Sequence, residues 1–295
     1  MAHVWKCTGL RWSPEGPVLM WDGGRRSGLP RGKRVGFAVP EEGVRTCVGA
    51  RGHACPVRAV VPGRSTGARC EECARLDRAH SVAADTIADD PRPYRVYLAW
   101  FGPGLVKVGI TGLQRGSARL LEQGAVCFSW LGTGPLMAAR RTEELLRAAL
   151  QVPDRIPYAE KRAVRSALPG TEEERATEVR ALHARAVALG GWPESLRPEP
   201  CEVIDHVEVF GLADAPAALG EVVELVRGGS VSGELVSAAG PDLHLAVAGG
   251  RRGVVVLDTR LMTGWGLVSP GASDAGASEL AFPVREFTQR PEGLF

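Results

Sequence analysis

The sequence has no long hydrophobic run, although 44% of its 295 residues are hydrophobic. No stretch approaches the roughly 18 consecutive apolar residues that a membrane-spanning helix needs. The segment from Met1 to Arg11 also contains no apolar core of the kind found in secretory signal peptides. We therefore expect a folded protein of the cytoplasm that has no membrane partner.

Motifs of several common enzyme classes are absent as well. No glycine-rich phosphate loop stands at a strand-to-helix junction, and no nucleophile elbow is present. Apart from His53, none of the histidines has a metal-ligand or catalytic-triad spacing. Nucleotide hydrolysis of the P-loop type and acyl transfer therefore find no support in the sequence.

The formal net charge of +2 conceals an asymmetry between the two ends of the chain. Residues 1–80 carry 14 Lys and Arg against 7 Asp and Glu, whereas residues 200–295 carry 6 against 13. A basic N-terminal third suits an anionic partner such as nucleic acid, although charge of either sign also serves to keep a surface hydrated.

Four of the seven cysteines lie close together, and the last two form a Cys-x-x-Cys pair. In a reducing cytoplasm this pattern favours metal over disulfides. The thiolates of Cys47, Cys55, Cys70 and Cys73 satisfy tetrahedral zinc, and His53 is an alternative to either of the first two. We predict a structural zinc, with free buried thiols as the alternative. The remaining cysteines are expected to be core thiols: Cys7, Cys127 and Cys201.

The predicted architecture is α+β and has three domains. Residues 1–90 form a zinc-ribbon-like β-rich domain, residues 91–192 an α/β core on a small antiparallel three-stranded sheet, and residues 193–295 a β-rich domain.

Alternation, turns and caps predict the elements within these domains. The expected strands are Val4–Trp12, Val18–Trp21, Arg34–Val39, Tyr94–Phe101, Leu105–Thr111, Val126–Leu131, Glu202–Phe210, Ser232–Ala238, Leu243–Ala248, Val254–Leu257 and Trp265–Val268. The expected helices are Ser117–Gln123, Pro135–Leu150, Tyr158–Leu168, Glu172–Leu189 and Ala215–Val226.

The central hairpin places two polar side chains on one face. If residues 102–104 (Gly-Pro-Gly) form the loop, Ala99 lies opposite Lys107 and Tyr97 opposite Gly109. Side chains alternate across a strand, so Tyr97 and Lys107 emerge on the same face as diagonal neighbours. Gly109, which has no side chain, is expected to leave room for a phosphate.

Helical periodicity singles out one acid on the helix that follows. At about 100° per residue Glu143 falls within the apolar stripe of residues 136–150, whereas Glu144 points almost the opposite way. A carboxylate on a packing face needs a partner such as a divalent cation or a cluster of basic groups. Pairing with Arg147 four residues on is the plain structural alternative.

The order of these residues resembles the GIY-YIG nuclease superfamily over about residues 94–150. The matching motifs are Val96-Tyr97-Leu98, Lys107-Val108-Gly109-Ile110-Thr111, an arginine at Arg115 or Arg119, and Glu143. Residues 122–125 and the upstream Cys-x-x-Cys are similar to an uncharacterised bacterial branch of that superfamily. Lys107 stands where the superfamily usually has a second aromatic residue.

The resemblance implies a metal-dependent nuclease that hydrolyses phosphodiester bonds in DNA or RNA. Glu143 would hold Mg²⁺ or Mn²⁺, Tyr97 would orient or deprotonate the attacking water, and Lys107 with Arg119 or Arg115 would neutralise the transition state. Two alternatives remain open. One is a nucleic-acid-binding module that does not cleave, and the other is an enzyme on this scaffold for a small anionic substrate.

Overall fold

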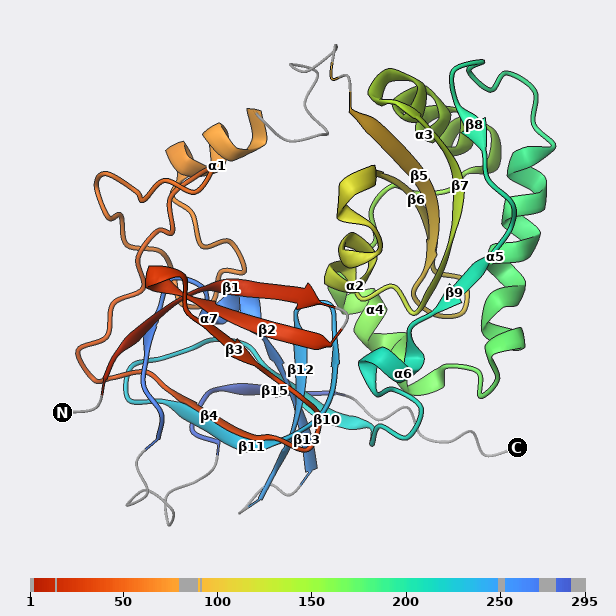
Figure 1. The fold of residues 1–295 in the computed structure, drawn as a ribbon. Coiled ribbons are helices and arrows are strands. Elements are labelled where there is room, and N and C mark those ends of the chain that lie inside the picture. The colour runs from red at the N-terminus through yellow and green to blue at the C-terminus, as the bar shows by residue number, and fades with distance from the viewer. Residues whose placement is uncertain are drawn as a thin grey trace. The chain divides into compact units, whose positions relative to one another are not determined.

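The computed structural model describes residues 3–13, 15–79, 90, 92–248, 253–270 and 280–287. The chain forms two compact units, one made of Met1–Arg78 with Asp214–Phe295 and the other of Ala79–Ala213. Both units combine sheets with helices, so the expected α+β class is confirmed (Figure 1). No helix in the described ranges is long and apolar enough to cross a membrane.

The first unit contains a six-stranded and a four-stranded sheet. The six-stranded sheet has the order β15 (Val284–Glu286), β10 (Ala218–Val222), β13 (Gly253–Asp258), β12 (Asp242–Val247), β11 (Ser230–Ala239) and β4 (Arg34–Ala38). The four-stranded sheet has the order β14 (Gly266–Leu267), β1 (Trp5–Ser13), β2 (Gly16–Trp21) and β3 (Arg26–Gly28). Its helices are η1 (Asp22–Gly24), α1 (Glu71–Ala79) and α7 (Thr259–Met262).

Strands from the two ends of the chain pair with each other in this unit, which corrects the expected separation of residues 1–90 from residues 193–295. β4 pairs antiparallel with β11, and β1 pairs antiparallel with β14. Alternation of side chains marks a strand but does not name its partner, so the sequence pattern could not reveal this pairing. Most of the stretch around the expected boundary at residue 90 lies outside the described residues.

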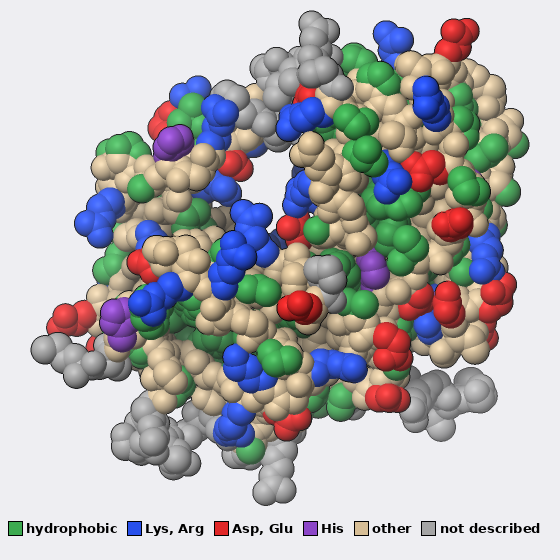
Figure 2. All heavy atoms as spheres, in the orientation of Figure 1, with side chains coloured by type: hydrophobic (Ala, Val, Ile, Leu, Met, Phe, Trp, Pro, Cys, Tyr) green, Lys and Arg blue, Asp and Glu red, His purple; other side chains and the backbone are tan. Residues whose placement is uncertain are grey.

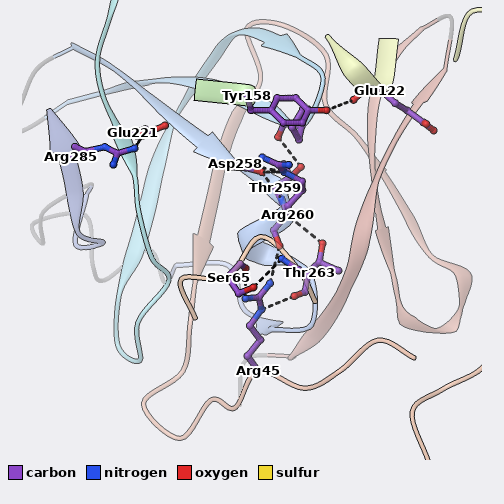
Figure 3. Close-up of polar contacts among 12 residues, drawn as sticks. Arg45, Ser65, Glu122, Tyr158, Glu221, Asp258, Thr259, Arg260, Thr263 and Arg285 are labelled. Atoms are coloured by element: carbon purple, nitrogen blue, oxygen red, sulfur yellow. Dashed lines mark hydrogen bonds and ion pairs between the residues drawn. The ribbon is translucent and has the colours of Figure 1, made fainter. Parts of the chain in front are cut away.

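A buried arginine also ties the two ends of the chain together. Arg45 is 1% exposed, and its guanidinium donates to the carbonyl oxygens of Thr263 and Arg260, each at 2.9 Å (Figure 3). It also donates to the carbonyl oxygens of Pro62 at 2.5 Å and Ser65 at 2.6 Å. Burial lowers the pKa of Arg45 to about 10, and these carbonyls satisfy the donors of the buried cation.

Two element predictions in the C-terminal part of the chain were wrong. Residues 215–226 do not form a helix, because β10 runs through them, parallel to β13 and antiparallel to β15. Helix propensity is a weak preference, and burial between two strands overrides it here. Residues 202–210 form the short strand β9 (Val203–Asp205) followed by the helical turn α6 (Val207–Phe210), where Asp205 accepts a hydrogen bond from the Val207 N–H at 2.7 Å.

The second unit is built on one antiparallel sheet with the order β6 (Val106–Gly112), β5 (Pro93–Trp100), β7 (Cys127–Pro135) and β8 (Arg197–Pro198). β9 also pairs with β7. The helices and turns of the unit are η2 (Leu113–Arg115), α2 (Ala118–Gln123), α3 (Leu136–Leu150), α4 (Tyr158–Val164), η3 (Arg165–Ala167), α5 (Glu172–Val187) and α6. Three strands and four helices of this unit therefore match their predictions closely.

The two faces of this sheet carry different side chains. The apolar face of β5, with Val96, Leu98 and Trp100, packs with buried residues of α3 and α5. The other face, with Tyr97 and Phe101, packs with Leu120 of α2 and other residues in a second cluster. Helices therefore pack on both faces of the sheet. Tyr97 and Lys107 lie on the face that packs with α2, whereas Glu143 belongs to α3, which packs on the other face.

Candidate metal centre and polar site

The four cysteines come together in the first unit. Their sulfur atoms all lie within 4.8 Å of one another, and Cys55 Sγ is 4.0 Å from Cys70 Sγ. A tetrahedral zinc with bonds of about 2.3 Å separates its sulfur ligands by about 3.8 Å. The cluster can therefore hold a metal ion such as zinc.

The backbone around the cluster is arranged to support thiolates. Cys47 Sγ accepts from the Gly49 N–H at 3.3 Å and from the Cys70 N–H at 3.2 Å. A hydrogen bond from the backbone of Ala59 lowers the pKa of the Cys55 thiol to about 7, whereas burial and the neighbouring cysteines raise the pKa of Cys73. Because metal ligands must be deprotonated, these N–H groups favour the form of the sulfur that binds metal.

Gly49 is required by the turn between the first two cysteines. Its φ is +80°, and a Cβ at this position would lie 1.8 Å from the carbonyl oxygen of His53. Only glycine fits so close an approach in the left-handed region. The turn therefore depends on Gly49 to bring Cys47 and Cys55 together.

His53 and the three remaining cysteines lie outside the cluster and differ in their exposure. His53 is exposed, and the cluster found among the described residues consists of the four cysteines without it. Cys7 and Cys127 are buried as expected, but Cys201 is exposed, so its assignment to a core was wrong.

The predicted register of the central hairpin is confirmed. Ala99 pairs with Lys107 and Tyr97 with Gly109. The α2-side face is therefore ordered in rows that cross three strands. From β6 through β5 to β7, the rows are Lys107–Ala99–Phe128, Gly109–Tyr97–Trp130 and Thr111–Arg95–Thr133.

Tyr97 is 2% exposed, and its hydroxyl accepts a hydrogen bond from Gln123 Nε2 at 2.9 Å. Burial raises the pKa of Tyr97, while Gln123 and Arg119 act in the opposite direction. The phenol therefore retains its proton at neutral pH and has that proton available to donate.

Gly109 does not leave the space that the sequence suggested. A Cβ at this position would lie 2.4 Å from the Tyr97 hydroxyl oxygen and 2.5 Å from its Cζ. The tyrosine ring itself fills the volume above the glycine. The expectation of room for a phosphate directly over Gly109 was wrong, and the lack of a Cβ instead makes room for the tyrosine ring.

Lys107 lies at the outer strand of the same face and is 8% exposed. Its Nζ is 5.7 Å from the centre of the Tyr97 ring and donates to the Asp154 carbonyl oxygen at 3.1 Å. Burial and the charge of Arg119 lower the pKa of Lys107 to about 8, against the effect of Glu143. The Lys107 ammonium therefore loses its proton at a lower pH than an ordinary lysine does.

Glu143 projects from α3 and is partly buried, whereas Glu144 is exposed and pairs with Arg147 at 3.2 Å. The prediction that Glu143 faces the packed side of the helix and Glu144 the exposed side is therefore confirmed. Burial raises the pKa of Glu143, and the charge of Asp154 adds to this, while Lys107 opposes it. Val108 N–H donates to the Pro153 carbonyl oxygen at 2.9 Å, which holds the segment containing Asp154 along the edge of β6.

The structure distinguishes the two candidate arginines. Arg115 forms an ion pair with Glu122 at 2.6 Å. Arg119, the second residue of α2, instead acts electrostatically on both Tyr97 and Lys107. Arg119 is therefore the arginine that belongs to the polar site.

One protein family matches most of the chain: its description reads "Protein of unknown function (DUF2797)", and the match spans residues 33–267. The chain belongs to the DUF2797 family. No curated protein and no solved structure matches it. The DUF2797 match contains the four cysteines and every residue of the polar site.

Sequence reasoning missed two members of the polar site of this chain, Gln123 and Asp154. Gln123 follows Arg119 by four residues on one short helix, so helical spacing places both on the same side and could have identified it. Asp154 lies in a segment without periodicity after α3, and no spacing rule connects it with β6. Only the pairing of that segment with the strand edge brings it to Lys107.

Proposed function

We propose that this protein is a metal-dependent nuclease that hydrolyses phosphodiester bonds in nucleic acid on a GIY-YIG-like core. One observation carries the proposal. Glu143 of α3 and Arg119 of α2 each act electrostatically on both Tyr97 of β5 and Lys107 of β6, and the Lys107 Nζ lies 5.7 Å from the centre of the Tyr97 ring. A proton donor, two cations and a carboxylate within mutual reach make up a set suited to phosphoryl transfer.

The carboxylates at this site suit a hard divalent cation. Burial raises the pKa of Glu143, and the charge of Asp154 raises it further. Mg²⁺ is usually held by one or two carboxylates together with substrate phosphates and water. Mg²⁺ or Mn²⁺ at Glu143 would supply Lewis-acid stabilisation of a phosphate oxygen.

The remaining roles follow from the state of each side chain. Tyr97 keeps its proton, which favours orienting the attacking water or a phosphate oxygen over deprotonating the water. Lys107 and Arg119 would neutralise the charge that develops on the phosphorus centre. Gln123 holds the Tyr97 hydroxyl in position through its hydrogen bond.

The cysteine segment of the first unit suits an anionic partner. Figure 2 shows Lys and Arg side chains on the face of the first unit around α1, where the cysteine segment lies. The exposed arginines between Cys47 and the end of α1 are Arg51, Arg58, Arg64, Arg69, Arg75 and Arg78. Zinc in the cysteine cluster would stabilise this small segment and would take no part in the reaction.

The test compares Glu143→Gln with Glu144→Gln on plain DNA and RNA substrates in the presence of Mg²⁺ or Mn²⁺. Glu143→Gln should abolish cleavage, by at least about a hundredfold, because it removes a charged metal ligand. It should leave binding of nucleic acid, measured by gel shift, largely intact. Glu144→Gln, on the exposed side of the same helix, is the matched control and should change little.

A second candidate is a nucleic-acid-binding module that does not cleave, and the near-complete burial of Tyr97 favours it. Such a module would bind in the gel shift whether or not divalent metal is present. Absence of cleavage by the unmodified protein with either metal would select this candidate, and equal loss in both variants would contradict the role of Glu143.

A further inference from the structure

Beside the Tyr97 row, the same face of the sheet carries a polar row that the proposed reaction does not use. Arg95 on β5 stands between Thr111 on β6 and Thr133 on β7. It lies two residues, or about 6.6 Å, along the strand from Tyr97. This separation is comparable with the spacing of consecutive phosphates along a nucleic acid strand.

The guanidinium of Arg95 is held in a fixed plane. Its central carbon lies 4.8 Å from the centroid of the Trp130 ring. Its Nε donates to Glu199 Oε1 at 3.1 Å, and the Thr133 hydroxyl donates to the same oxygen. A guanidinium that is already oriented loses little freedom when it binds a ligand.

The binding end of this guanidinium is unused. Within the described ranges, the two terminal nitrogens of Arg95 have no hydrogen-bond partner, and the side chain is 30% exposed. The neighbouring Thr111 hydroxyl, in a residue only 4% exposed, also has no partner there. Parallel N–H groups on a planar fork match two oxygens of a phosphate.

We propose that Arg95, seated on Trp130, binds the phosphate next to the scissile one. The substrate is then a strand with at least two consecutive phosphodiesters, not an isolated phosphodiester. This inference rests on the proposed function, because it takes the scissile phosphate to lie beside the Tyr97 hydroxyl. Glu199 occupies the Nε edge and leaves the fork free, but its charge opposes the anion and limits the affinity.

The experiment uses the full chain carrying Glu143→Gln, which prevents cleavage. Its probes are a thymidine dinucleotide with one phosphodiester and a trinucleotide with two, and binding is measured by isothermal titration calorimetry. The trinucleotide should bind about tenfold more tightly, as expected for one charge-assisted contact. Arg95→Lys should remove most of that advantage and leave dinucleotide binding unchanged.

A second variant acts in the opposite direction. Glu199→Gln removes the opposing charge but keeps an acceptor for Arg95 and Thr133, so it should tighten trinucleotide binding several-fold. Misfolding cannot produce such a gain. The controls are Arg180→Lys and Glu173→Gln, which alter an exposed ion pair on α5, the helix on the opposite face of the sheet. Neither control should change binding of either probe.

The possible failures are distinguishable. Equal affinity for the two probes, or an Arg95→Lys effect of the same size on both, would overturn the subsite and leave the proposed nuclease standing. Loss of affinity in Glu199→Gln would show that the Arg95–Glu199 pair is only structural. Failure of the chain to bind either probe or longer single strands would overturn the subsite together with the proposed partner.

Discussion

At the scale of single residues, the site holds two opposite charges that are partly withdrawn from water. Burial raises the pKa of Glu143 and lowers that of Lys107 to about 8, so each group is shifted towards its neutral form. Each also counteracts the shift of the other through its charge. A bound cation and a phosphate would take over this pairing, which couples ligand binding to the protonation of both residues.

This coupling predicts the pH dependence of cleavage. Metal binding needs the Glu143 carboxylate, so the rate should rise with pH through its raised pKa. Neutralisation of the transition state needs the Lys107 ammonium, which is charged below about pH 8 and is lost as the pH rises through that value. The pH–rate profile at fixed metal concentration should therefore be bell-shaped, with an alkaline limb near pH 8.

Lys107→Arg provides the matched test of that alkaline limb. Arginine remains charged throughout the accessible range, so the limb near pH 8 should disappear even if the maximal rate falls. An alkaline limb that stays in place in the variant would assign it to a group other than Lys107.

At the scale of elements, local rules predicted much of the second unit, and one comparison of caps shows their limit. Thr171 accepts from the Glu174 N–H at 3.3 Å, and Glu174 bonds back to the Thr171 N–H at 3.1 Å, which confirms the predicted capping box. Ser117 also stands at a helix start, but its side chain makes no capping hydrogen bond. Thr171 is extended and has Glu174 three residues on, whereas Ser117 has a helical backbone conformation and Leu120 at the corresponding position, so a cap residue type alone does not predict a capping hydrogen bond.

The sequence predicted the parts of the site in which strand alternation or helical periodicity relates one residue to the next. It did not predict the other parts. Alternation placed Tyr97 and Lys107 on one face, and the helical period chose Glu143 over Glu144. Those relations involve neighbours within one hairpin or one helix. The approach of Asp154 depends on a loop against a strand edge, and the position of Gly109 under the tyrosine ring depends on the rotamer of Tyr97. Neither is encoded in spacing along the chain.

The cysteine segment is an element whose stability should depend on metal. We expect about one zinc per chain in protein purified without added metal, and Cys73→Ser should reduce this to nearly none, because three sulfurs leave the tetrahedral site incomplete. Elemental analysis measures the content. Cys201→Ser is the control, since Cys201 is exposed and outside the cluster. Zinc unchanged by Cys73→Ser, or lost equally in the control, would contradict the four-cysteine site.

At the scale of the whole molecule, the two compact units do not follow the order of the chain, because one unit combines its two ends and the other is the segment between them. The first unit takes strands from both ends, and Arg45 is buried against the carbonyls of residues 260 and 263. The second unit has both of its hydrophobic clusters within residues 79–213. The central segment therefore has a core of its own, whereas residues 1–78 depend on a partner segment more than a hundred residues away.

This division predicts the behaviour of two truncated chains. Residues 79–213 alone should fold, because no member of their clusters is removed. Residues 1–213 should contain the same folded unit, but their N-terminal strands should be unfolded. Loss of β11 leaves β4 unpaired, loss of β14 leaves the outer edge of β1 unpaired, and Arg45 loses two of its acceptors.

The folded state of the two fragments and of the full chain can be compared by amide NMR spectra. The spectrum of residues 1–213 should show the dispersed signals of the 79–213 fragment, together with a set of poorly dispersed signals from the strands before residue 40. Limited proteolysis should trim it to the central unit, while the full chain resists. Val35 and Phe37 are buried in the full chain because β4 lies at the end of the six-stranded sheet. Slowly exchanging amides in β4 of the truncated chain would show that the N-terminal strands form their core without the C-terminal ones, and that the two ends of the chain are separate domains after all.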